Sequence, residues 1–308
     1  MPKFLEKSEI DYKKWDDCVQ HASQSIIYAE SWYLDCVAPS WGGIVLEENG
    51  RYLFVFPVAY NRKAGVNYVY QPFFTQQLGY FSNDYSLSMF YDKIVSILQD
   101  KFRYVAYAFN TYNTEEFEFP EFVRQRVTYE IAPIGELLEV RKKYNSNRKR
   151  DIKKAVKAEL RLESISDFET VLEVFRANRG LLVDDLKDAD YQRLEELVEE
   201  ASRLNRVVMF KIVDAEHSIH AVGLFLTDKH RMIYLFGAAT QLGMTSGAMS
   251  FMLDQAIAKS HEAGLIFDFE GSDFPNLSKF YSGFGGVKKN YPHYQFNRLP
   301  WYLKLWKK

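Results

Sequence analysis

The stretch from Val207 to Ala238 reads VVMFKIVDAEHSIHAVGLFLTDKHRMIYLFGA. It contains three runs rich in β-branched and aromatic residues, at 207–213, 219–226 and 232–238, which are separated by two short polar links. Such runs are typical of strands, and such links are typical of hairpin turns. The stretch therefore predicts an antiparallel meander of three strands.

Helices and further strands are predicted on both sides of this meander. Apolar residues at helical spacing predict two helices before it, and Gly264 is placed to end a helix that follows it. The predicted elements around the meander are helices at 167–176, 191–204, 246–261 and 274–284, and strands at 265–269 and 287–296.

The first half of the chain predicts the same order of elements, although the two halves show no visible sequence repeat. Asn49-Gly50 lies between two apolar runs, and this pair is a strong hairpin signal because both residues accept positive φ. The predicted elements are helices at 10–21, 31–37 and 85–98, and strands at 44–48, 52–58, 66–71 and 104–109. A chain of 308 residues fits two domains. We predict a mixed α/β (α+β) fold with domains at 1–135 and 136–308, each a largely antiparallel mixed sheet flanked by helices.

The most charge-biased stretch lies between the halves, at 141–161, where only two acids oppose many cations. The cations are Arg141, Lys142, Lys143, Arg148, Lys149, Arg150, Lys153, Lys154, Lys157 and Arg161. Apolar residues within the stretch would share one helix face, so we predict that residues 136–161 form a basic helix that links the domains. It is either a solvated helix face or a cationic wall for the phosphates of a cofactor, a nucleotide-linked substrate or tRNA.

Composition limits the partners and the compartment. The net charge of −2 gives no global basic field, so we expect no DNA partner. Residues 1–10 carry charges and no apolar run, so we expect no signal peptide and a cytoplasmic protein. Residues 232–253 contain no charged residue, but the polar residues and glycines among them predict a buried strand, a turn and a helix rather than a membrane span.

Three smaller features complete this survey. The tail at 301–308 mixes aromatic rings with lysines, which is typical of a docked terminus or of a weak peripheral contact with a membrane. Cys18 and Cys36 are expected to remain thiols. The histidines share no spacing with cysteines or acids, so the sequence predicts no metal site and no Ser/His/Asp set.

Four motifs resemble those of FemABX-like transferases and of the related BioF2-like GNAT acyltransferases. They are QPFFTQQLG at 71–79, YNSNRKRDIKKA at 144–155, FDFEGS at 267–272 and KFYSGFGG at 279–286. The resemblance covers most of the chain and implies a tandem GNAT-like fold. GNAT relatives, acetyltransferases among them, move acyl groups from acyl-CoA to amines. FemABX relatives take aminoacyl groups from charged tRNA and add them to cell-wall precursors.

The resemblance also implies a donor site at a glycine-containing turn. In GNAT proteins a Gln/Arg-x-x-Gly-x-Gly/Ala loop presents backbone N–H groups to the pyrophosphate of CoA at a helix N-terminus, where anions are favoured. Gly243 fits this pattern, whereas Thr240 and Thr245 depart from it. The implied residues for acyl-CoA (acetyl-CoA) binding are Gly243, Thr245, Ser246, Gly247, Arg148 and Lys149. The alternative is that Thr245 or Ser246 only caps the helix.

Candidate catalytic residues follow the donor turn. Asp268 and Glu270 would lie on the same side of a strand, where two close carboxylates raise the pKa of one of them and provide a base for an amine. The alternative is that they bond the N–H groups of the next helix. Tyr281 matches the spacing at which the GNAT resemblance implies an acid for the leaving thiolate.

The acceptor site is assigned to the aromatic run that contains Gln71, Gln76 and Gln77. Their amides would bind an amine-bearing small molecule or cell-wall precursor, or the run would pack between domains. The sequence thus predicts an N-acyltransferase that moves an acyl group from acyl-CoA to an amine. A FemABX-like transferase that uses charged tRNA and a non-catalytic binding protein of the same fold remain alternatives.

Overall fold

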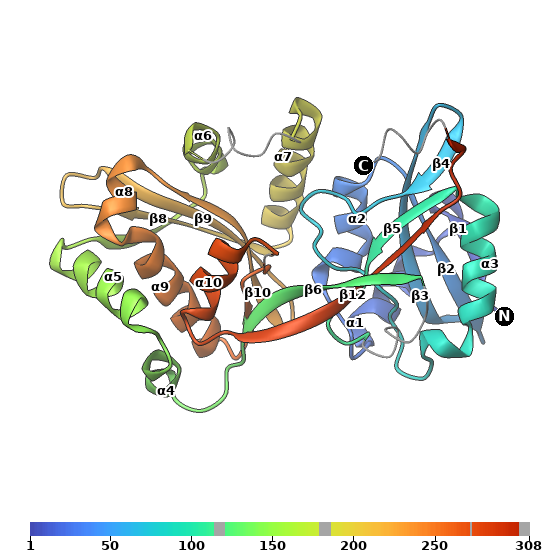
Figure 1. Ribbon diagram of the computed structural model, residues 1–308, viewed down its shortest axis with the longest axis horizontal. Coiled ribbons are helices and arrows are strands. Elements are labelled where there is room, and N and C mark those ends of the chain that lie inside the picture. The colour runs from blue at the N-terminus through green and yellow to red at the C-terminus, as the bar shows by residue number, and fades with distance from the viewer. Residues whose placement is uncertain (114–120, 179–185, 272, 302–308) are drawn as a thin grey trace. The chain divides into compact units, whose positions relative to one another are not determined.

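The computed structural model describes residues 1–113, 121–178, 186–271 and 273–301, except the side chains of 122 and 123. The chain divides into two compact units, Met1–Arg126 with Asn290–Lys308, and Val127–Lys289 (Figure 1). The predicted division at residue 135 treats each half as one continuous segment. In the structure, the first unit also contains the last residues of the chain.

The N-terminal unit is built on strands in the order β1-β2-β3-β4-β5-β12. Its elements are β1 (Lys3–Glu6), α1 (Tyr12–His21), α2 (Ser31–Val37), β2 (Trp41–Glu48), β3 (Arg51–Lys63), β4 (Val66–Val69), α3 (Tyr91–Lys101), β5 (Tyr104–Ala108) and β12 (Val287–Asn297). Strands β4 and β5 are parallel, and the other neighbours in this order are antiparallel. Asn49 and Gly50 turn the β2–β3 hairpin with φ of 51° and 77°, as their sequence predicts.

The C-terminal unit repeats this plan with strands in the order β7-β8-β9-β10-β11-β6. Its strands are β6 (Phe122–Ile131), β7 (Arg161–Ile165), β8 (Val207–Val213), β9 (Ile219–Thr227), β10 (Arg231–Ala239) and β11 (Ile266–Asp268). Its helices are α4 (Leu137–Lys142), α5 (Ser146–Lys157), α6 (Phe168–Asn178), α7 (Asp188–Arg203), α8 (Gln241–Ser246), α9 (Ala248–Glu262) and α10 (Pro275–Ser282). Strands β10 and β11 are parallel, and the other neighbours are antiparallel.

The two units therefore share one architecture, a largely antiparallel mixed sheet with a single parallel pair and flanking helices. This confirms the predicted mixed α/β fold with two tandem domains. In both units the strand beyond the parallel pair is far away in sequence, because β12 pairs with β5 and β6 pairs with β11.

Alternate residues of the central strands pack on opposite faces of the C-terminal sheet. Phe225 and Met252 belong to a cluster that α9 and α10 cover on one face. On the other face, Phe175 of α6 packs against Phe236 of β10, with ring centroids 4.6 Å apart. The sheet is thus buried on both faces, which explains the nearly continuous apolar runs from which the meander was predicted.

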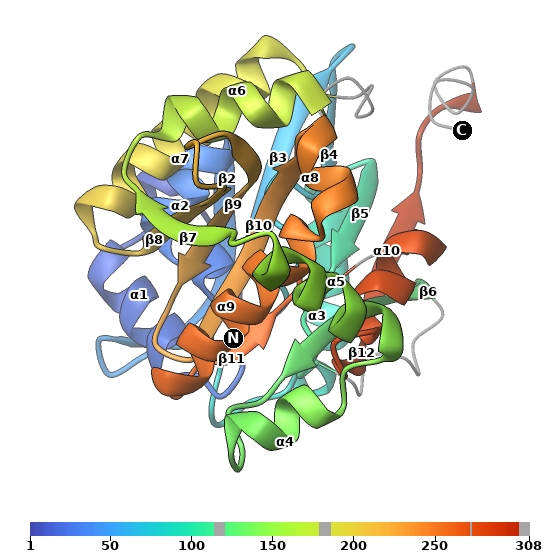
Figure 2. The same ribbon diagram turned by 90° about the vertical axis from the view of Figure 1, so that its left-hand side faces the viewer.

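The basic stretch lies in the C-terminal unit, and instead of the single predicted helix at 136–161 it forms the two helices α4 and α5 and the first residue of β7. Helix α5 packs against α8 and α9 (Figure 2), and Ala155 on its inner side is fully buried. Helix α4 is tied to α9 by Arg141, whose guanidinium donates two hydrogen bonds of 2.8 Å to the Asp254 carboxylate. The prediction missed this because the apolar face of α5 is narrow.

The uncharged stretch at 232–253 forms β10, α8 and the start of α9. Among the described residues, no helix is long and apolar enough to cross a membrane. Of the aromatic and basic tail, only Trp301 lies within the described residues, and its side chain is exposed; residues 302–308 lie outside them.

Candidate functional site

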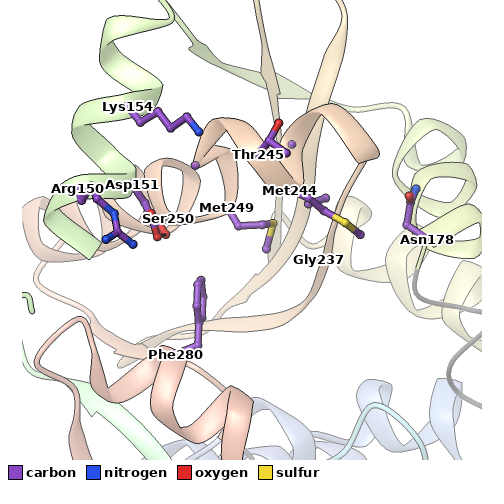
Figure 3. A pocket seen from close by; sticks show the side chains of 13 residues that line it. Arg150, Asp151, Lys154, Asn178, Gly237, Met244, Thr245, Met249, Ser250 and Phe280 are labelled. Carbon is purple, nitrogen blue, oxygen red and sulfur yellow. Dashed lines mark hydrogen bonds between the residues drawn. The ribbon is translucent and has the colours of Figure 1, made fainter. Parts of the chain in front are cut away.

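The sheet of the C-terminal unit opens beside β10. This strand pairs with β9 as far as Ala239, but its pairing with β11 covers only Arg231–Ile233. Gly237 and Ala239, beyond the point where β10 and β11 part, line a cavity of about 590 Å³ (Figure 3). The strands therefore create an opening in the middle of the unit, at the carboxyl end of the parallel pair.

Six elements and the turn at Gly247 form the walls of this cavity. The lining residues are Arg150, Asp151 and Lys154 of α5, Asn178 of α6, Gly237 and Ala239 of β10, Gly243, Met244 and Thr245 of α8, Gly247, Met249 and Ser250 at the start of α9, and Phe280 of α10. Figure 3 shows the α5 side chains on one side of the cavity and Phe280 below them. The cavity thus brings together the glycine turn and the basic helix, the two segments that the sequence suggests for a donor.

Arg150 and Lys154 give the cavity a positive wall. They lie four residues apart on α5, so they share one side of the helix, and both are exposed. Within the described ranges no ion pair involves either of them. Asp151 is the acid on this wall, and its carboxylate pairs with Arg148 at 3.0 Å. The wall therefore carries uncompensated positive charge suited to phosphate.

The predicted donor residues Arg148 and Lys149 do not line this cavity. The Arg148 guanidinium donates to Ser250 Oγ at 3.0 Å and lies 4.1 Å from the ring centroid of Phe280. Burial lowers the pKa of Arg148, against the opposing effect of Asp151. Lys149 Nζ donates to the carbonyl oxygen of Lys142 at 2.8 Å. Both side chains hold α5 in place, and their neighbours on the helix face the cavity.

The glycine turn has a different local structure from the predicted loop. Thr240 is the N-cap of the short helix α8, and its Oγ1 accepts from the N–H of Gly243 at 3.2 Å. Gly247 then separates α8 from α9. The suggested caps, Thr245 and Ser246, therefore lie inside α8, where the Thr245 hydroxyl donates to the carbonyl of Leu242.

The two glycines permit close contacts between backbones. A Cβ on Gly243 would lie 1.7 Å from the carbonyl oxygen of His220. Gly247 has φ of 81°, and its Cβ would lie 2.3 Å from the carbonyl oxygen of Asp151 on α5. Because real Cβ atoms do not approach so closely, these glycines set the distance from α5 to the turn and hence the width of the cavity.

Gly247→Ala is expected to cost about 1–3 kcal/mol more than Gly264→Ala in unfolding free energy. Gly264 also has positive φ, 70°, but nothing lies within 4 Å of a Cβ there. The Gly264→Ala control should therefore lose only the backbone strain of about 1–2 kcal/mol in unfolding free energy. Gly247→Ala has this strain too, and its methyl group also pushes α5 away from the turn. Urea unfolding of both variants measures the difference. Equal losses would contradict the close contact.

Asp268 and Glu270 do not share a strand face, contrary to the prediction. Strand β11 ends at Asp268, and Glu270 has φ of 51°, so the alternation of side chains stops between them. The Asp268 carboxylate is 1% exposed and accepts from Thr128 Oγ1 at 2.8 Å and from the N–H of Glu270 at 2.9 Å. The carboxylate nearest to it across the sheet is that of Glu130.

Arg231 joins these two buried carboxylates. Its Nη1 donates to Glu130 Oε1 at 2.7 Å and to Asp268 Oδ2 at 3.3 Å. Burial raises the pKa of Asp268 to about 6, and the Arg231 guanidinium opposes this shift. The group is a buried charge cluster formed by β6, β10 and β11.

The raised pKa of Asp268 predicts a pH-dependent stability. Because this pKa lies above its ordinary value of 3.8, the folded state binds the proton more tightly. The contribution is fully present below about pH 4 and is lost as the pH rises through about 6, at up to about 1.4 kcal/mol per pH unit. Asp268→Asn should remove this part of the slope in urea unfolding between pH 4.5 and 7. A variant with the wild-type slope would contradict the assignment.

The structure places Tyr281 in the core of the C-terminal unit. Its ring stacks on Phe269 with centroids 5.1 Å apart, and the residue is 8% exposed. The neighbouring Phe280 lines the cavity, and Tyr281 does not.

The three glutamines hold a loop of the N-terminal unit in place. Gln71 accepts from the N–H of Ala108 at 3.0 Å and donates to the carbonyl of Thr75 at 2.8 Å. Gln77 accepts from the N–H of Thr111 at 3.0 Å and donates to Gln76 Oε1 at 2.7 Å. Much of their hydrogen-bonding capacity is thus used within the unit.

Sequence reasoning missed three features of this site. Arg150 and Lys154 could have been selected from their i, i+4 spacing. The Arg231 cluster has no local signal, because its members lie far apart in sequence. The prediction of no Ser/His/Asp set was wrong, because Asp214, His220 and Ser246, which share no sequence spacing, form a hydrogen-bonded set.

Comparisons with known proteins support the fold. No family model and no curated protein matches the chain. Among solved structures, FemX aligns with 99% of this chain, and the alignment covers 100% of the FemX chain, at 12% identity and a TM-score of 0.69. The C-terminal domain of a putative lysylphosphatidylglycerol synthetase from Agrobacterium fabrum covers 97%, with 95% of its own chain, at 10% identity and a TM-score of 0.57. A tandem GNAT protein from the clavulanic acid biosynthesis pathway covers 97%, with 99% of its own chain, at 9% identity and a TM-score of 0.57. The predicted tandem GNAT-like, FemX-like fold is confirmed.

Proposed function

We propose that this protein, which has a tandem GNAT-type fold like that of FemX, is an N-acyltransferase. It would move an acyl group from acyl-CoA to an amine. The observation that carries the proposal is the cavity beside β10, where Arg150 and Lys154 face the turn at Gly247. The cations and the start of α9, which has 15 residues, favour the phosphates of the donor. Met249 and Phe280 offer apolar contacts to its acyl arm.

The reaction needs a proton acceptor for the amine. The amine nitrogen attacks the thioester carbonyl, the C–N bond forms, the C–S bond breaks, and the amine proton passes to a base. Glu270 is the candidate base, because it follows the end of β11 at the point where β10 and β11 part and is half-buried. Tyr281, which the resemblance implies as the acid for the leaving thiolate, lies in the core outside the cavity lining, so we do not assign it this role, and the sulfur leaves as the thiolate.

The acceptor is an amine on a small molecule or on a cell-wall precursor. The N-terminal unit is the candidate for holding it, through the loop that contains Gln71, Gln76 and Gln77. The side chain of Phe73 in this loop is 43% exposed and would contact an apolar part of the acceptor.

Titration with CoA and acetyl-CoA tests the donor. At 100 times its dissociation constant a ligand stabilises the folded state by about 2.7 kcal/mol, which a thermal-shift assay detects. Arg150→Gln with Lys154→Gln should weaken CoA binding at least about tenfold, since each charge-assisted contact contributes about 1.5–3 kcal/mol. Lys153→Gln with Lys157→Gln removes the same charge from the same helix outside the cavity lining. If acyl-CoA is the donor, this matched pair binds CoA as the wild type does.

A second candidate is an aminoacyl-tRNA donor, as the FemABX resemblance implies. It is favoured by cations that extend along α5 beyond the cavity, since Lys153 and Lys157 are exposed and have no ion pair among the described residues. In this case CoA produces no shift, both double variants weaken tRNA binding, and the affinity falls steeply with salt. Tight binding of an amine ligand, without product from either donor, would instead indicate a non-catalytic binding protein.

A further inference from the structure

Helix α8 forms one wall of the cavity but has only six residues. A helix this short does not maintain its structure alone, because its nucleation is unfavourable. Gly243, Met244 and Thr245 of this helix line the cavity. The contacts that hold α8 therefore determine the shape of the cavity.

His220 at the start of β9 contacts both ends of α8. Its carbonyl oxygen accepts from the N–H of Thr240, the N-cap, at 3.0 Å. The backbone of Gly243 packs directly against the same oxygen, which leaves no space for a side chain there. At the other end of the helix, His220 Nδ1 lies 2.9 Å from Ser246 Oγ. One residue of the sheet thus anchors the whole length of α8.

The imidazole is itself held by Asp214, from the turn between β8 and β9. His220 Nε2 lies 3.1 Å from Asp214 Oδ2. The other oxygen, Oδ1, accepts from the N–H groups of Glu216 and Ser218, at 3.0 Å and 2.9 Å. The hydrogen bond from His220 is the largest cause of a lowered pKa at Asp214, so this carboxylate is ionised. With Nε2–H directed at Asp214, Nδ1 faces the Ser246 hydroxyl, which also lies 3.4 Å from the carbonyl oxygen of Gly243.

Ser246 is the residue before Gly247, where the chain passes from α8 to α9. The contact of Gly247 with α5 requires that α8 ends at a fixed place. Ser246 is not among the residues that line the cavity, although both of its neighbours are. These three residue types also form the triad of serine hydrolases, but here the hydroxyl is directed at β9, so the set acts through α8 and not on a substrate.

We propose that Asp214, His220 and Ser246 form a latch that preorganises the donor cavity, with His220 as its positioning residue. Its effect on donor binding rests on the proposed function, whereas its effect on α8 does not. Loss of the latch lets α8 and the Gly247 turn move away from Arg150 and Lys154. The donor then binds more weakly, while the chemistry of the bound donor is unchanged.

The test uses Ser246→Ala, with Ser246→Thr as the conservative variant that keeps the hydroxyl. Hydrogen exchange of the α8 amides in the ligand-free protein should rise about 2- to 12-fold in Ser246→Ala, the range for one lost hydrogen bond. The dissociation constant for CoA, measured by calorimetry, should rise as well, by at most this factor, because the affinity falls in proportion to the fraction of molecules in the competent state. In turnover assays KM for the donor rises and kcat does not. Ser246→Thr should restore both the exchange and the affinity.

His217→Asn is the matched control, because His217 lies in the same turn with an exposed side chain and φ of 62°, which asparagine also adopts. It should leave exchange and affinity unchanged. His220→Gln keeps a polar group near the Nε2 position but loses the contact with Ser246, so it should behave as Ser246→Ala does.

Three outcomes separate the latch from the proposed function. Unchanged exchange and affinity in both Ser246→Ala and His220→Gln would overturn the latch. Covalent labelling of Ser246 by a fluorophosphonate would also overturn it, since this would make Ser246 a nucleophile. Faster exchange in Ser246→Ala, with no CoA binding by the wild type, would support the latch and reject acyl-CoA as the donor.

Discussion

Replacement of Arg231 with leucine is expected to lower the unfolding free energy by about 3–5 kcal/mol at pH 7, because it leaves two buried carboxylates without their cation. The Arg231 side chain is 3% exposed, and those of Glu130 and Asp268 are 8% and 2% exposed. In so little water the carboxylates must repel each other or take up protons. Either response costs free energy that the guanidinium now offsets.

Urea unfolding at pH 7 and pH 5 measures this effect. The loss should be smaller at pH 5, since without Arg231 the pKa of Asp268 rises further and its protonation then stabilises the folded state. Arg203→Leu is the control, because Arg203 pairs with Glu200 on the surface, where its side chain is 68% exposed; a loss of at most about 1 kcal/mol is expected there. Equal losses in the two variants would contradict the role of the cluster.

Adding Glu130→Gln and Asp268→Asn to Arg231→Leu should recover part of the stability. Neutral amides carry no charge that needs the guanidinium. A triple variant as unstable as Arg231→Leu alone would show that Arg231 acts through packing and not through its charge.

Glu270→Gln is expected to lower kcat by about 10²–10⁴-fold, the usual contribution of a general base. The amide of glutamine has the same shape but accepts no proton from the amine. Since Glu270 is half-buried and lies after the end of β11, the substitution should leave the unfolding free energy within about 0.5 kcal/mol of the wild type.

Glu262→Gln is the matched control for this prediction. Glu262 is an exposed residue at the end of α9, which precedes β11, whereas Glu270 follows the other end of that strand, so kcat should not change. Steady-state assays at saturating donor and acceptor provide the comparison. Wild-type turnover in Glu270→Gln would remove Glu270 from the proton transfer and direct the search to other groups.

The sequence predicts the interior of each sheet better than its edges. Strands β8, β9 and β10 were predicted within a few residues, since strands buried on both faces are nearly continuous apolar runs. The edge strands β1 and β7 were missed because KFLE and RLESI are short and charged. Charged residues protect an edge strand from unwanted pairing. Because they replace the apolar residues of the strand pattern, a prediction based on hydrophobic pattern does not detect the strand.

The candidate site was predicted by segment but not by residue. The basic helix and the glycine turn do meet at one cavity, yet Arg148 and Lys149 serve the packing of α5 while Arg150 and Lys154 face the cavity. The apolar residues of α5 indicate its buried side, as the burial of Ala155 shows, but which of its cations face the cavity depends on where α8 and α9 lie. Glu270 was misplaced because the strand rule fails where φ becomes positive.

The pairing of β12 with β5 also has a consequence for how the protein is made. Residues 293–297 complete the N-terminal sheet by pairing with residues 104–108, so that sheet stays incomplete until residues 293–297 have left the ribosome. Until then, the nascent chain exposes the unpaired edge of β5, which can recruit a strand from another molecule. Synthesis of this protein therefore includes an interval in which a strand edge that the folded protein covers is exposed.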